Sequence, residues 1–160
     1  MIDKFVAFLE LNGWKIIKNE NRGDISLNEI LEKYSGLPAE FVELIEEYKI
    51  ISSADDTTCF FCINDYNSES EDAFKWNEFE NMSLEAAEGD EKWQKEIETW
   101  WQDKLPIIIS VGGGYSYYAI DTGNGGKIIN GCEPEFEETD IVAENFSDFI
   151  DQILNGQIEL

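Results

Sequence analysis

Three strand-like segments separated only by short glycine-rich turns occupy the second half of the chain. Residues 105–111 are apolar at almost every position, which is typical of a strand that is buried on both faces. Residues 115–121 and 126–131 are rich in aromatic and β-branched residues, as strands are. The turns between them are too short for the crossover connection that parallel strands need. The sequence therefore predicts an antiparallel sheet with hairpin-joined central strands.

The glycines in these turns have two competing explanations. A phosphate-binding loop needs Gly-Lys-Ser/Thr at a fixed spacing, and a dinucleotide-binding loop needs a helix directly after its glycines. Residues 112–114 are all glycine but lead into the strand-like YSYYAID, and Gly126-Lys127 is followed by IING. Because neither pattern is met, we interpret the glycines as turn residues, with Asn124-Gly125 as the strongest hairpin signal.

Amphipathic helices are predicted before and after these strands. Residues 26–36 begin with a capping box, Ser26 and Glu29, and Pro38 is placed to start the next helix. Apolar residues at helical spacing predict further helices over residues 2–9, 93–101 and 146–154. The predicted elements follow the order helices, strands and a final helix. This order predicts a single α+β domain over residues 1–160, with a mostly antiparallel sheet packed with helices.

The net charge limits the classes of partner. The 160 residues include 35 acids and 11 bases, for a formal net charge of −24, and with 42% hydrophobic residues a folded core is still expected. Such a field repels nucleic acids and anionic membranes and attracts basic surfaces. Solubility or adaptation to salt would also explain the charge. A basic protein partner is the more specific interpretation.

The cellular compartment is predicted from the start of the chain and from its cysteines. Residues 1–10 lack a basic segment and carry Asp3 and Glu10, so no signal peptide is predicted. No apolar run reaches the length of about 18 residues that a membrane span needs. We therefore expect a cytoplasmic protein whose three cysteines are reduced.

Residue types that carry common catalytic chemistry are scarce. The chain has no histidine, which excludes Ser-His-Asp and Cys-His units. Cys59 and Cys62 fall in a predicted strand over residues 57–64, where their side chains would point to opposite faces, and Cys132 is distant. No catalytic residue, metal or cofactor is predicted. The many neighbouring carboxylates leave a carboxylate-based hydrolase as an alternative.

The order of several short motifs resembles the SUKH superfamily. A helix ends in GLP at residues 36–38 and runs into AEFVELIEEY, YSYYAIDTGNGGKI follows much later, and ENFSDFIDQIL closes the chain. Together these motifs span residues 26–154. Two features depart from the family pattern: KIISSADD stands where many members carry Asn-Gly, and the acidic stretch over residues 93–101 is longer than in most members.

The superfamily includes yeast Smi/Knr cell-wall regulators and many bacterial immunity proteins. The resemblance therefore implies a SUKH-like fold and a non-catalytic, protein-binding function. On this basis we expect an immunity protein that neutralises a cognate bacterial toxin, often a nuclease, whose phosphate-holding site would be basic. The alternative is an intracellular regulatory or scaffold protein. An unpaired edge strand would also allow a homodimer.

Aromatic residues surrounded by charge are typical of protein interfaces. Residues 65–82 are predicted to form a polar surface segment in which Trp76 is exposed. The stripe Trp93, Ile97, Trp100 and Trp101 is predicted to face the core. The residues predicted to contact a partner, with the two tyrosines on one strand face, are Trp76, Glu78, Glu80, Tyr115, Tyr117, Glu133 and Glu135.

Overall fold

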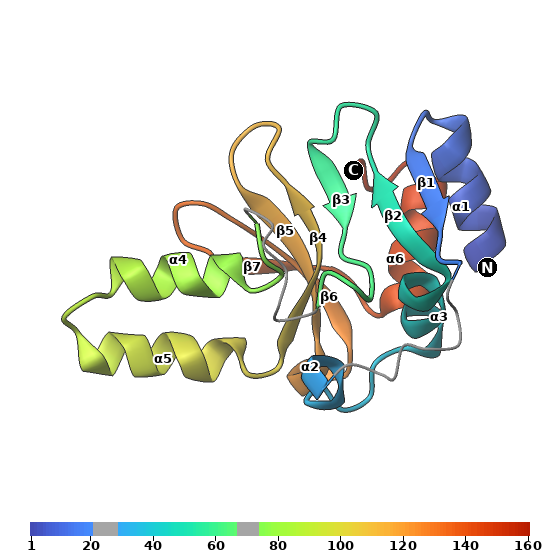
Figure 1. Ribbon diagram of the computed structural model, residues 1–160. Helices are drawn as coiled ribbons and strands as arrows, with labels where there is room; N and C mark the ends of the chain where they lie inside the picture. Colours follow the sequence, from blue (N-terminus) through green and yellow to red (C-terminus); the bar gives the residue numbers. More distant parts are fainter. Residues whose placement is uncertain (21–28, 67–73) are drawn as a thin grey trace.

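The computed structural model describes residues 1–20, 29–66 and 74–160. Within this part of the chain, one seven-stranded sheet is packed with helices, which confirms the predicted α+β class (Figure 1). The elements in chain order are α1 (Ile2–Leu11), β1 (Lys15–Lys18), α2 (Glu29–Glu32), α3 (Ala39–Glu47), β2 (Tyr48–Ser52), β3 (Thr58–Phe60), α4 (Glu78–Ala86), α5 (Glu91–Trp101), β4 (Lys104–Ser110), β5 (Ser116–Asp121), η1 (Thr122–Asn124), β6 (Lys127–Cys132), β7 (Thr139–Ala143) and α6 (Phe146–Leu154).

The sheet is an antiparallel meander. Its strand order, β1 to β7, follows the chain, and each strand pairs antiparallel with its neighbours. In the centre, Ile109 of β4 lies opposite Tyr117 of β5, and Tyr117 lies opposite Gly131 of β6. β1 and β7 form the two edges. The prediction of antiparallel, hairpin-joined central strands is confirmed.

At two positions in the central part of the sheet, the structure requires glycine. Gly125 follows η1 with a φ of 70°, in the left-handed region that side chains disfavour. Gly131 of β6 lies against the ring of Tyr117, and a Cβ at this position would come within 2.6 Å of ring atoms. The Tyr117 ring can therefore lie across β6 only because position 131 has no side chain.

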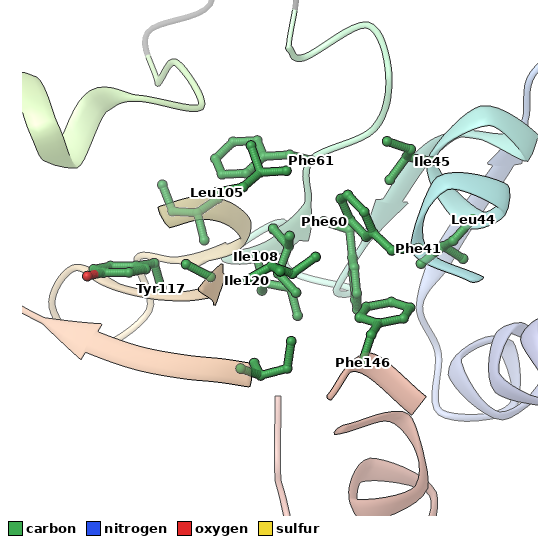
Figure 2. Close-up of a cluster of buried hydrophobic side chains, with 14 of the residues drawn as sticks. Phe41, Leu44, Ile45, Phe60, Phe61, Leu105, Ile108, Tyr117, Ile120 and Phe146 are labelled. Carbon is green, nitrogen blue, oxygen red and sulfur yellow. The ribbon is translucent and has the colours of Figure 1, made fainter. Parts of the chain in front are cut away.

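A phenylalanine-rich core lies between the sheet and helices α1, α3 and α6 (Figure 1). The ring centroids of Phe5 in α1 and Phe60 in β3 are 5.8 Å apart. Those of Phe41 in α3 and Phe146 in α6 are 5.4 Å apart, and both rings meet the same cluster (Figure 2). Each helix directs its apolar stripe toward the sheet, because its buried residues recur every three or four positions.

The side chains of β5 divide between the two faces of the sheet. Tyr118 packs on Phe149 of α6, with 5.1 Å between the ring centroids. Its neighbour Tyr117 points the other way and contacts aromatic residues of α4 and α5. These two helices form a hairpin that is inserted between β3 and β4 and extends away from the sheet (Figure 1). No helix in the described ranges is long and apolar enough to cross a membrane.

The structure differs from prediction on both sides of residues 67–73. Residues 65–82 were predicted to be a polar surface segment, but α4 already begins at Glu78. The strand predicted over residues 57–64 is limited to β3, so Cys59 lies in the strand and Cys62 lies beyond its end. Ser26 is outside the described residues, and the capping box stays a prediction.

Removing the Phe146 ring should strongly destabilise the fold. Phe146 is fully buried between Phe41 and Phe149, so Phe146→Ala leaves a cavity as well as losing apolar burial. We expect the free energy of unfolding to fall by about 3–5 kcal/mol in urea titrations. The control Ile141→Ala removes an exposed side chain and should change it by less than about 0.5 kcal/mol. Equal losses in the two variants would contradict this description of the core.

Candidate functional site

An aromatic cluster joins the α4–α5 hairpin to the sheet. Phe79 of α4 lies 5.0 Å from Tyr117 of β5 and 4.8 Å from Phe136 of the β6–β7 loop, measured between ring centroids. Trp101, the last residue of α5, lies 5.3 Å from Tyr117. All four side chains are buried. We call these four residues the aromatic cluster; it brings the hairpin, the central sheet and the β6–β7 loop together.

Two hydrogen bonds fix the β6–β7 loop on this cluster. The indole Nε1–H of Trp101 donates to Oε1 of Glu137 over 2.7 Å, and the Tyr117 hydroxyl donates to the carbonyl oxygen of Phe136. A hydrogen bond to a carboxylate is stronger than one between neutral groups. The loop is therefore held beside both helices of the hairpin, and the carboxylates that it carries have defined positions.

Carboxylates from three segments meet above the cluster. Burial raises the pKa of Glu80 in α4, and the nearby charges of Glu98 in α5 and Glu137 in the loop raise it further, while Lys33 lowers it. Glu98 forms an ion pair with Lys95 at 3.5 Å, but both side chains are largely exposed, so this pair neutralises little of the charge. The site concentrates negative charge that a cation would stabilise.

The four glutamates predicted at the interface lie on the segments that the aromatic cluster joins. Glu78 and Glu80 are half-buried in the first turn of α4, where the helix dipole favours negative charge. Glu133 and Glu135 are exposed in the β6–β7 loop. The structure thus brings together two acidic stretches that are far apart in the sequence. Glu80, Glu98 and Glu137 lie near one another, and we call these three acids, with Glu133 and Glu135 of the same loop, the acidic face. Glu78 is two residues from Glu80 on α4 and lies on another side of the helix, where it lines a depression with Asn81 and Glu85.

The structure places the three predicted aromatic contact residues partly or fully below the surface. Trp76 is half-buried, because its ring packs against Tyr34 and Tyr66 at centroid distances of 6.4 Å and 6.0 Å, so it is not the exposed anchor that was expected. Tyr117 is only 1% exposed and supports the acidic face from beneath. Tyr115 is half-buried against Phe74, at 5.1 Å between ring centroids.

The tryptophan stripe of α5 is only partly in the core. Ile97 and Trp101 are buried as predicted, and Trp100 is half-buried. Trp93 is 47% exposed, which corrects the prediction that it faces the core. It lies in the first turn of α5, where the hairpin extends beyond the sheet, so no strand can cover it there (Figure 1).

Two residues of the acidic face were missed by sequence reasoning. Glu98 belongs to the acids of α5 that were expected to face solvent, and nothing in its local sequence distinguishes it from them. Glu137 stands among several neighbouring carboxylates, and its bond to Trp101 joins residues 36 positions apart. Helical spacing could have placed Glu98 beside α4 only if the hairpin had been predicted first.

Cys59 is a half-buried free thiol, and Cys62 is a buried one. Burial raises the pKa of Cys59 to about 11 and raises that of Cys62 further above its usual value, so both thiols are protonated at neutral pH. In the described part of the chain, no three His, Cys, Asp or Glu side chains are arranged to hold a metal ion.

Comparison with known proteins identifies no relative: no protein-family model matches the chain, and no curated protein matches it. The resemblance to the SUKH superfamily therefore stays a prediction from the sequence. The functional argument rests on the geometry of the acidic face.

Replacing Glu80 by Gln should stabilise the fold at neutral pH. Because the pKa of Glu80 is higher in the folded than in the unfolded state, the free energy of unfolding falls as the pH rises through that folded-state pKa. A Gln side chain does not ionise, so the variant avoids this decrease. Above that pKa, Glu80→Gln should exceed the wild type by a few tenths to about 1 kcal/mol in free energy of unfolding. Below the unfolded-state pKa of about 4.3, the two proteins should be equal. Urea titrations across this pH range test the sign, and a difference that grows toward acid pH would contradict it.

Replacing Trp101 by Phe should loosen the β6–β7 loop. The change keeps an aromatic ring in the cluster but removes the donor to Glu137, which should lower the free energy of unfolding by about 1–3 kcal/mol. Hydrogen exchange of the loop amides around Phe136 should become faster. Trp93→Phe is the matched control, because Trp93 is exposed and should leave exchange in the loop unchanged. Unchanged exchange in both variants would show that the bond does not hold the loop.

Proposed function

We propose that the chain is a protein-binding domain whose acidic face binds a basic surface of a partner protein. The observation that carries this proposal is the contact of Phe79 with Phe136, which sets the first turn of α4 beside the β6–β7 loop. Glu80 of α4 and Glu137 of the loop thereby lie near Glu98 of α5, beside buried aromatic residues. Such a surface needs no catalytic group in order to bind tightly.

The electrostatics favour a cationic partner. The net charge of −24 steers basic proteins toward the molecule and can raise association rate constants to about 10⁸ M⁻¹s⁻¹ at low salt. Once bound, a Lys or Arg side chain of the partner would relieve the repulsion that raises the pKa of Glu80. Binding would thus add attraction between the acids and the partner's cation, which offsets the repulsion among the acids.

The resemblance to the SUKH superfamily suggests the biological role of this binding. In that role the chain is an immunity protein, and its partner is a toxin domain with a basic active site, such as a nuclease. A nuclease holds phosphates with Lys and Arg side chains, and a surface of carboxylates competes for the same groups. The acidic face would therefore inhibit the toxin by covering its active site.

Growth rescue tests this proposal. Candidate toxin modules encoded by neighbouring genes are co-expressed with the wild type, which should restore growth against its cognate toxin. The variant Glu98→Lys/Glu133→Lys/Glu135→Lys reverses three exposed charges of the acidic face and should fail to restore it. The control Glu10→Lys/Glu43→Lys/Asp151→Lys makes the same charge change at exposed positions of α1, α3 and α6 and should rescue. Failure of the wild type, or equal behaviour of the two triple variants, would contradict the proposal.

Binding measurements with the purified toxin module separate charge from shape. The dissociation constant should rise steeply with ionic strength, because salt screens the attraction between exposed charges. Charge reversal on the acidic face should raise the dissociation constant by roughly a hundredfold or more at low salt, and the matched control should change it far less. A dissociation constant that is independent of salt would exclude recognition by the acidic face.

A further inference from the structure

The α4–α5 hairpin carries two surface depressions of different character. Each lies on the side of its helix away from the buried residues, because its lining recurs every three or four positions along the helix. The depression on α5 has a volume of about 550 Å³ and is lined by Lys92, Lys95, Glu96, Thr99 and Trp100. The depression on α4 has a volume of about 840 Å³ and is lined by Glu78, Asn81, Leu84, Glu85 and Glu88, with Gln94 of α5.

The depression on α5 combines aromatic surface with lysines. Trp100, which lines it, is half-buried. Lys92 and Lys95 pair with Glu96 and Glu98 at 3.8 Å and 3.5 Å, but the four side chains are between 50% and 89% exposed, so these ion pairs are weak. Tryptophan is enriched at protein interfaces, and the two lysines can form ion pairs with a partner at its rim.

The depression on α4 is acidic and more polar than the one on α5. Leu84 is half-buried in it, and Glu85 and Glu88 are exposed beside it. Both depressions run along helices of similar length, nine residues in α4 and eleven in α5. In a contact between them, Leu84 can meet Trp100 while Lys92 and Lys95 approach Glu85 and Glu88. The chain carries both halves of this complementarity itself.

We propose that copies of this chain associate head to tail, with the α5 depression of one copy against the α4 depression of the next. The two surfaces belong to different helices, so the contact is heterologous and leaves one surface of each kind free on a dimer. This association differs from binding of a basic partner in its response to salt. Salt screens the long-range repulsion between two copies of charge −24, so moderate salt strengthens self-association.

Charge reversal on the hairpin tests the proposal without any partner protein. Sedimentation velocity of the wild type at roughly 10 to 500 μM and about 0.15 M NaCl should show a mass that rises with concentration above the 18.4 kDa of one chain. Lys92→Glu/Lys95→Glu and Glu85→Lys/Glu88→Lys should each raise the dissociation constant by roughly tenfold or more, and an equimolar mixture of the two variants should restore association.

A matched control isolates the contact. Lys4→Glu/Lys49→Glu makes the same charge change at exposed lysines outside the hairpin, so it adds the same general repulsion and should weaken association far less than Lys92→Glu/Lys95→Glu. A wild type that stays at 18.4 kDa, a mixture that does not associate, or equal effects of the control would each overturn the proposal. Such outcomes would leave growth rescue by the acidic face unaffected.

Discussion

The packing of Phe79 against Tyr117 and Phe136 is the contact on which the rest of the candidate site depends. Phe79 and Ser83 are the buried residues of α4, so a single aromatic side chain supplies most of the apolar anchor of this helix. Burial of one such ring is worth about 1.5–3 kcal/mol. The same ring touches the β6–β7 loop, so one contact decides both where the hairpin leaves the sheet and which carboxylates become neighbours.

The acidic face works against the stability of the fold that carries it. Glu80 is half-buried near Glu98 and Glu137, and its raised pKa reflects first the cost of burying its charge and then the repulsion by these two acids. The aromatic cluster beneath offsets that cost, because its rings are buried and its two polar groups, the Trp101 indole and the Tyr117 hydroxyl, both donate hydrogen bonds to the loop. Repulsion of this kind is common where a surface is suited to a ligand rather than to folding alone.

The parts of the fold that were predictable are those set by local sequence. The central strands follow from apolar runs and glycine turns, and α6 follows from the spacing of Phe146, Phe149, Ile150 and Ile153. The start of α4 was missed because its amphipathic pattern is weak and polar residues dominate it. Trp76 was expected at the surface because its sequence neighbours are polar, yet Tyr34 packs on it from a distant part of the chain.

In the candidate site, too, local sequence predicts some features, and tertiary contacts decide the others. The acids at positions 78, 80, 133 and 135 could be selected from sequence as an interface hypothesis. The approach of Glu80 to Glu98 and Glu137 could not be predicted, because it depends on Phe79 reaching Phe136. The exposure of Trp93 also depends on tertiary structure: its helical spacing places it with Ile97 and Trp101, and only the length of the hairpin beyond the sheet leaves it uncovered.

The order of the strands has a consequence for evolution. Every strand pairs with its neighbours in the chain, so the meander can assemble from local contacts, and the hairpin is an insertion between β3 and β4 rather than a link in the sheet. Its sequence and length can therefore diverge while strand register is preserved. The surface of this one insertion could change during evolution while the remaining scaffold is kept, much as antibodies vary their loops on a constant sandwich.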